Sequence, residues 1–238
     1  MSKQSKTVAS TTGLPMPVDF NVTAYNAVHR RVEPQSAKYP ALYEHFGGGW
    51  NAVAYRFHAV ADADVTFTNS VRAYGDGPAQ PHRYRQERAL FTFFVNGLSC
   101  IESLCYSLFA IGSMLDPHHF AMATEDDLRA VSPQSTLKSY EAAFKQESLT
   151  GELRKLVSSS DSKEWVYVRN KLAHRVAPGR IINMATHAGP VAPAEWKITP
   201  NTIFIDATTT RSRRRWLAEA LSETFLSLND FVDRMLPK

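Results

Sequence analysis

Residues 89–115 read ALFTFFVNGLSCIESLCYSLFAIGSML and form the most apolar run in the chain. The run is long enough to cross a membrane, but Glu102 lies near its middle, where a carboxylate is costly in lipid. We therefore expect a buried core helix, beginning a little earlier near Arg83, that passes through the centre of a helical bundle. Several other apolar faces at helical spacing in the chain have to be buried against it.

Glu102 is the one acidic residue in this run. A carboxylate inside a bundle needs a cation or a hydrogen-bond donor. It could form a purely structural ion pair, or it could be an active-site acid that orients Arg169. We expect Glu102 to lie within hydrogen-bonding reach of Arg169 or His174.

A second helix is predicted over residues 161–176, which read DSKEWVYVRNKLAHRV. Asp161 can act as the N-cap and Glu164 can complete a capping box. Pro178 disfavours helical geometry at the residue before it, so the helix should end just past His174.

This second helix has two distinct faces. One face is apolar and predicted to be core; it carries Trp165, Val168, Leu172 and Val176. The opposite face carries Tyr167, Asn170 and His174, where a surface helix would ordinarily carry Lys and Glu. A polar stripe of this kind opposite a core stripe indicates a binding or catalytic face.

Residues 169–174, Arg-Asn-Lys-Leu-Ala-His, resemble the R-x4-H signature of the HEPN superfamily, in the variant with Asn directly after Arg. These are small helical-bundle domains, and many are metal-independent ribonucleases of toxin–antitoxin, abortive-infection and CRISPR-linked systems. Others only bind RNA or a partner. The resemblance covers about Arg83 to Met235. HEPN toxins that modify nucleotides carry a Tyr two residues after the His, and Val176 stands there instead.

The resemblance implies an endoribonuclease, with Arg169, Asn170 and His174 as candidate catalytic residues. Cleavage by the 2′-OH needs a group that transfers protons and a cation that stabilises the charge on phosphorus. The pKa of a histidine such as His174 suits proton transfer, and the forked donors of Arg169 suit phosphate. Asn170 could orient either group, and Glu102 and Tyr167 are candidate supporting residues.

One copy of the motif does not make a compact site. On an ideal helix Arg169 and His174 are about 140° apart around the axis and about 7.5 Å apart along it. The resemblance implies that two protomers place their motifs face to face, so we expect a homodimer with a composite cleft. Expected partners are therefore RNA, a second copy and, for a toxin or phage-defence effector, an antitoxin or other regulatory protein.

Additional cations lie near the predicted cleft. Lys171 and Arg175 could contact flanking phosphates, and Arg211, Arg213 and Arg214 crowd the start of the last predicted helix. These last three could bind phosphate together with Arg215, or they could be solvated while Arg215 pairs with Glu219 across one turn. The formal net charge of +4 is compatible with a polyanionic partner but does not require one.

Metal and cofactor chemistry is not expected. His58, Asp62 and Asp64 lack further ligands, and the adjacent His118 and His119 diverge on any regular element. The two cysteines lie five residues apart on the apolar helix and cannot bridge each other, which favours a reduced, cytoplasmic protein without a membrane span.

The predicted fold class is all-α: a HEPN-like helical bundle with a small β-hairpin insert and a helical N-terminal extension. We expect a mobile arm over residues 1–19, the extension over 20–80, the bundle over 81–238, and the insert at about 180–206. The glycines at 47–49 are interpreted as a loop before a helix. Two alternatives to the ribonuclease stay open: a non-catalytic RNA- or protein-binding module, and a helical protein whose Arg and His merely close a helix end.

Overall fold

The computed structural model describes residues 13–174, 178–183, 192–198 and 201–236, with only the backbone of His174 and Asn201. The helices are α1 (Val22–Val32), the short 3-10 helix η1 (Glu33–Ala37), α2 (Pro40–Tyr74), α3 (Gln80–Leu115), α4 (Glu125–Ala130), α5 (Pro133–Ala143), α6 (Ser148–Ser158), α7 (Ser160–His174) and α8 (Thr209–Met235). The strands are β1 (Gly179–Ile181), β2 (Glu195–Ile198) and β3 (Asn201–Phe204). The described part is therefore all-α with a small β insert, as predicted.

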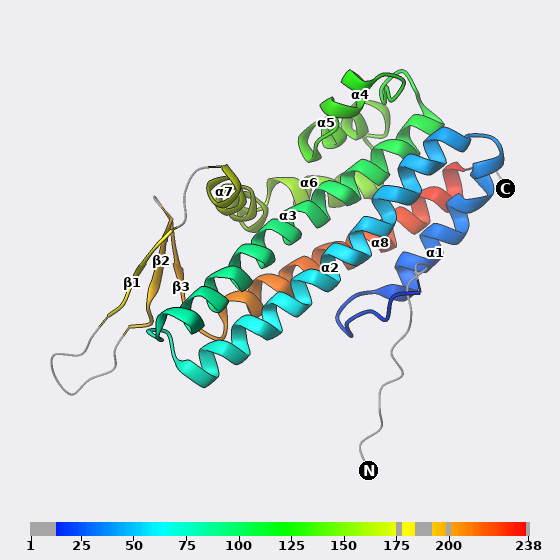
Figure 1. The fold of residues 1–238 in the computed structure, drawn as a ribbon. Coiled ribbons are helices and arrows are strands. Elements are labelled where there is room, and N and C mark those ends of the chain that lie inside the picture. The colour runs from blue at the N-terminus through cyan, green and yellow to red at the C-terminus, as the bar shows by residue number, and fades with distance from the viewer. Residues whose placement is uncertain (1–12, 175–177, 184–191, 199–200, 237–238) are drawn as a thin grey trace, which may run out of the picture.

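Two long antiparallel helices, α2 and α3, form the spine of the molecule (Figure 1). Gly75 ends α2 with a positive φ of 71°, which a glycine adopts without strain, and its N–H bonds back to the Val71 carbonyl. The predicted core helix corresponds to α3, and Leu90, Phe93 and Leu104 on it are fully buried.

The glycines at 47–49 do not form a loop, contrary to the prediction, because helix α2 continues through them. Gly49 is buried where α2 crosses α3. A Cβ at Gly49 would lie 2.5 Å from the Ser107 hydroxyl oxygen, so a side chain there would force the helices apart. The glycine therefore allows close helix packing, and tertiary contact offsets its weak helix propensity.

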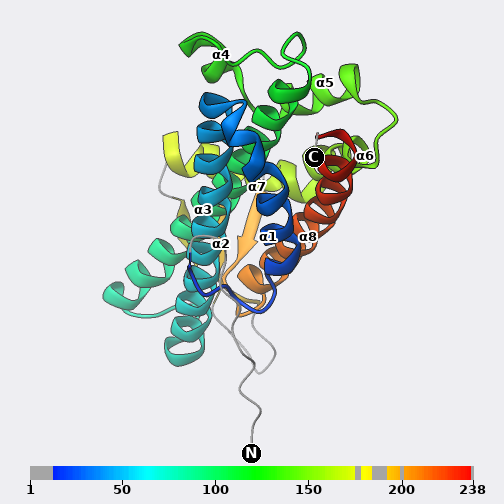
Figure 2. The ribbon, with the colours of Figure 1, turned by 90° about the vertical axis from the view of Figure 1, so that its right-hand side faces the viewer.

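The bundle is closed by α1 and α8, which lie side by side across α2 (Figures 1 and 2). Aromatic rings fill the space between these helices. Tyr25 of α1 stacks on Trp50 of α2 with 4.7 Å between ring centroids, and Phe225 of α8 meets both edge-on. Residues 20–80 thus share one continuous core with the rest of the chain, with no gap at residue 80.

The segment just before α1 is held in place rather than free. Met16 is 3% exposed, and Asp19 pairs with Arg214 of α8 at 2.6 Å. The expected mobile arm therefore does not extend to these residues; its first twelve lie outside the described part of the chain.

Helices α5 and α7 pack on α3. Figure 2 shows α4 and α5 at one end of the bundle. Tyr140 of α5 is fully buried and donates its hydroxyl to the Leu108 carbonyl of α3 at 2.9 Å. Helix α6 packs against α5, α7 and α8. Helix α7 in turn packs on α3, so the chain returns to the central helix before the insert begins.

The insert between α7 and α8 is a three-stranded antiparallel sheet in the order β1-β2-β3. Arg180 pairs with Trp196 across β1 and β2, and Trp196 pairs with Ile203 across β2 and β3. Paired residues share a face, and this face docks on α3, where the Arg180 guanidinium donates to the Gln86 side-chain oxygen at 2.7 Å. The predicted small β insert is thus confirmed, as three short strands.

Among the described residues α3 alone passes the length and composition test for a membrane span. Most of its apolar window is buried inside the bundle, which fits the expected core helix.

Candidate functional site

The largest side chain in the contact between α7 and α3 is that of Trp165. Trp165 is fully buried, and its ring lies 4.9 Å from that of Phe93 and 5.1 Å from that of Phe94. Gly97 leaves the room that the indole occupies. The predicted apolar face is confirmed for Trp165 and for Val168, which is also fully buried, while Leu172 is partly buried against the core. Val176 lies outside the described residues.

The start of α7 differs from the predicted cap. The Ser159 hydroxyl, rather than the Asp161 carboxylate, accepts the N–H of Ser162 at 3.1 Å. Glu164 is not part of a capping box either. It accepts two hydrogen bonds from the guanidinium of Arg213 on α8, at 2.9 and 2.8 Å. Helix α7 is therefore tied to α8 by a two-point ion pair.

Arg169 forms an ion pair with Glu102 of α3. The predicted contact between these two residues is thus present. The Arg169 side chain is 21% exposed and that of Glu102 is 36% exposed, so the carboxylate is less buried than the sequence indicated. Ser99 donates its hydroxyl to the second carboxylate oxygen at 3.4 Å. The pair sits at the edge of the α3–α7 contact, reachable from solvent.

A second arginine lies on the far side of Glu102. Arg56 of α2 donates to the carbonyl of Ser99 and to the hydroxyl of Ser103. Arg56, Glu102 and Ser103 line one cavity of about 430 Å³ between α2, α3 and the start of α5. Sequence analysis missed Arg56, although an arginine one turn after Val53 and directly before Phe57, on a helix with a core face, was a visible signal.

The outward face of α7 borders another cavity, of about 420 Å³. Tyr167, Asn170 and Lys171 line it, together with Lys163 on the same helix. The Lys171 ammonium lies 5.6 Å from the centre of the Tyr167 ring, a cation–π contact. The Tyr167 hydroxyl is buried and has no hydrogen-bond partner among the described residues. This face combines cations with a free hydroxyl, a set of groups suited to a phosphate or a polar ligand.

Sequence analysis also missed Lys163. It lies one turn before Tyr167 and two turns before Asn170, so helical spacing alone could have placed it on this face.

His174 ends α7, but its side chain lies outside the described residues, as does all of Arg175. The structure brings Arg169 to Glu102, on a different side of the helix from the cavity that Asn170 and Tyr167 line. Tyr167, Asn170 and Lys171 therefore lie together on one side of α7, and Arg169 lies on another side.

Two of the four arginines at the start of α8, Arg213 and Arg214, are engaged by carboxylates. Arg213 binds Glu164, and Arg214 binds Asp19 and Asp64, the latter at 3.2 Å. Both side chains are mostly buried in these ion pairs, so they are neither solvated, as one alternative expected, nor available to phosphate, as the other did. Arg211 is exposed, so of Arg211, Arg213 and Arg214 it alone is free to meet a ligand.

In the described part of the chain, no group of three or more His, Cys, Asp or Glu side chains could hold a metal ion. His119 instead hydrogen-bonds Asp116 at 2.7 Å, close to the end of α3.

A comparison of the chain with protein-family models, with curated proteins and with solved structures finds no match in any of the three. The residues and the geometry of α7 therefore carry the functional argument.

Proposed function

We propose that the protein is a metal-independent endoribonuclease of the HEPN type that acts as a homodimer, with Arg169, Asn170 and His174 as its catalytic residues. The observation that carries this proposal is the arrangement of α7. A buried tryptophan fixes the helix on α3, a carboxylate holds Arg169, and a basic face with Tyr167 and Asn170 stays open. Fixed elements of this kind hold reacting groups in place.

The chemistry follows from the side chains. The 2′-oxygen of the RNA attacks phosphorus while a base takes its proton, the bond from phosphorus to the 5′-oxygen breaks, and an acid protonates that leaving oxygen. His174 supplies proton transfer and Arg169 stabilises the negative charge on phosphorus. The products carry a 2′,3′-cyclic phosphate and a 5′-OH.

A second protomer supplies what one chain lacks. One histidine cannot be base and acid in the same step, and two protomers bring two. The outward face of α7 is the surface proposed to meet its counterpart, with Lys163 and Lys171 beside the strand that enters the shared cleft. Basic groups there favour a polyanion such as RNA as the bound chain.

The second candidate function is a non-catalytic RNA- or protein-binding module. The Glu102–Arg169 pair favours it, because a carboxylate on the guanidinium reduces the positive charge left for phosphate. In this alternative Arg169 holds α7 on α3, while Lys163 and Lys171 hold the partner.

The test is incubation of the purified protein with total RNA, followed by analysis of the fragment ends. We expect cyclic-phosphate 3′ ends from the wild type, unaffected by EDTA. His174→Ala and Arg169→Ala should each lower the rate on the order of 10²-fold or more. Arg129→Ala on α4 is the control, since its side chain is 74% exposed and remote from α7.

The homodimer has its own test. Mixing Arg169→Ala with His174→Ala protomers should recover part of the activity, because the heterodimers keep one Arg169 and one His174 in the shared cleft, where water takes over one of the two proton transfers. A chain that remains monomeric at micromolar concentration, or a His174→Ala variant that cleaves as well as the wild type, would contradict the ribonuclease and leave the binding module.

A further inference from the structure

A groove of about 390 Å³ lies where α3, α7 and the sheet meet, apart from the cavities described above. Its lining includes Tyr84, Glu87, Arg88 and Phe91 of α3, Leu172 of α7 and Trp196 of β2. Its volume falls within the range of roughly 300–1,000 Å³ that binds small molecules or single chemical groups.

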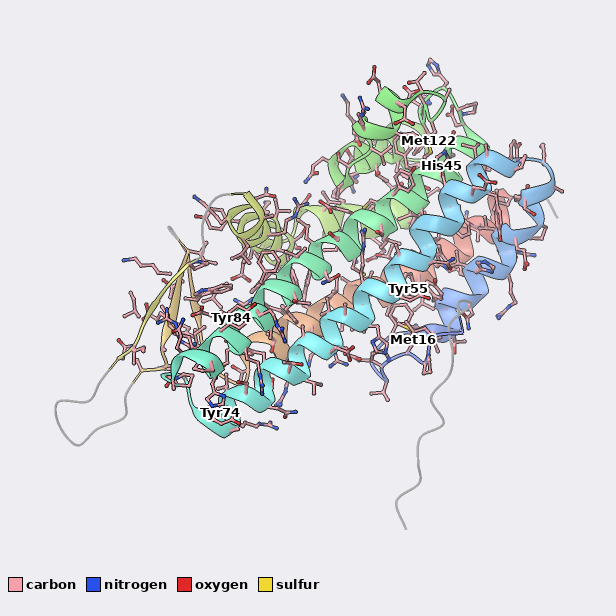
Figure 3. All side chains as sticks on the ribbon, viewed as in Figure 1. Met16, His45, Tyr55, Tyr74, Tyr84 and Met122 are labelled. Carbon is pink, nitrogen blue, oxygen red and sulfur yellow. The ribbon has the colours of Figure 1, made fainter. Side chains whose placement is uncertain are left out.

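Aromatic rings stand open along the α3 side of this groove. Tyr84 is 61% exposed and Phe91 is 43% exposed. They lie seven residues apart, so both fall on one face of the helix, about 10 Å apart along its axis. Figure 3 places Tyr84 on the stretch of α3 between the sheet and α7. Trp196 forms a rigid opposite wall, since it is buried and its indole N–H donates to the Pro178 carbonyl.

The charge around these rings is positive. The Arg88 guanidinium lies 5.9 Å from the centre of the Tyr84 ring. Within the described ranges of the chain, neither Arg85 nor Arg88 has an ion-pair partner. Glu87 is already compensated, by Arg83 at 2.8 Å and by Arg180 at 4.0 Å. The groove therefore offers flat apolar faces next to Arg88, a cation without a carboxylate partner among the described residues.

Exposed aromatic rings beside arginines are the features that bind single-stranded nucleic acid, where bases stack and cations follow the phosphates. We propose that unpaired bases of an RNA strand stack on Tyr84 and Phe91 while Arg88 contacts the phosphate between them. This inference rests on the proposed function for its ligand. Leu172 lines the groove two residues before His174, so a strand that crosses the end of α7 reaches these rings.

The experiment measures binding without cleavage. A short fluorescent 2′-O-methyl RNA has no free 2′-OH and cannot be cut by the proposed chemistry. Fluorescence anisotropy should show tighter binding of the single strand than of the matching duplex. Tyr84→Ala and Phe91→Ala should each weaken binding on the order of tenfold. Arg88→Ala should also reduce the salt dependence of binding, by about one phosphate contact.

Two matched variants control for general effects. Tyr55→Ala removes a tyrosine that is 57% exposed on α2, away from the groove, and should bind as the wild type does. Tyr84→Phe keeps the stacking ring and should also bind normally. If Tyr84→Phe loses as much affinity as Tyr84→Ala, stacking is not the interaction and the inference is overturned.

The remaining outcomes separate this inference from the ribonuclease. Binding that depends on Tyr84 and Phe91, in a protein that cleaves no RNA, supports the groove and refutes the enzyme. Cleavage of RNA with unchanged binding by both alanine variants refutes the groove alone. If these variants instead change the oligomeric state in size-exclusion chromatography and leave binding unchanged, the groove is an interface between copies of the chain, which also overturns the inference.

Discussion

The indole of Trp165 lies against the backbone of Gly97, so closely that a Cβ at Gly97 would come within 1.9 Å of the ring. No rotation of a flexible side chain relieves that contact, because both rings beside Trp165 are buried as well. The distance between α3 and the motif helix α7 is therefore set by the absence of one methyl group.

Gly97→Ala should destabilise the fold by about 1–3 kcal/mol, the usual cost of overpacking a filled core. Urea unfolding monitored by tryptophan fluorescence measures it. Gly151→Ala is the matched control: nothing lies within 4 Å of a Cβ there, and Ala in helix α6 should be neutral or stabilise by about 0.4–1 kcal/mol. Equal stability of Gly97→Ala and wild type would contradict the packing described above.

Arg169→Ala should change stability by less than about 1 kcal/mol, because its partner Glu102 is 36% exposed and water replaces the lost contact. A large loss of RNA cleavage in this variant would then come from the reaction and not from unfolding. Thermal unfolding of both proteins under the assay conditions checks this. A collapse of the unfolding midpoint would instead make Arg169 chiefly a structural residue.

Arg213→Ala should cost more stability than Arg211→Ala. Arg213 makes two hydrogen bonds to Glu164 and one to the Thr209 carbonyl, and its side chain is only 18% exposed. Losing such a charged pair costs about 1–3 kcal/mol. Arg211 is exposed and should be neutral to folding. Denaturant midpoints of the two variants decide the order, and the reverse order would show that the tie between α7 and α8 is weak.

The thiols of Cys100 and Cys105 should not react in the native protein. Both are fully buried, and burial raises the pKa of each to about 12, so almost no thiolate exists at pH 8. Titration with a disulfide reagent should label neither thiol at first and both after unfolding in guanidinium. Fast labelling of the folded protein would mean that α3 opens locally.

The features that could be predicted from the sequence are those that depend on the pattern of residues within a single helix. The apolar period of α3 and the single acid within it predicted both a core helix and the Glu102–Arg169 contact. The glycines at 47–49 were misread because Gly49 packs against Ser107 of another helix, and no local pattern reports that contact. The cap at Ser159 was missed for a smaller reason, since Asp161 two residues later is an equally good cap by type.

The candidate site was harder to predict, because its ion pairs form between residues that are far apart in the sequence and close only in the folded chain. Arg213 and Arg214 stand near Glu219 in the sequence, yet they bind Glu164, Asp64 and Asp19 instead. The aromatic groove likewise joins α3, α7 and the sheet, three segments that only the folded chain brings together.

The contact of Arg214 with Asp19 and Asp64 has a consequence for synthesis. A ribosome makes the chain from its N-terminus, so Asp19 and the apolar faces of α1 and α2 emerge long before α8 exists. The α2–α3 hairpin can pair early, since its contacts are local in sequence, but the side of α1 and α2 that packs on α8 stays uncovered until α8 is made. Nascent chains stalled before α8 should therefore expose an apolar surface that a chaperone can bind, and completion of α8 should end that exposure.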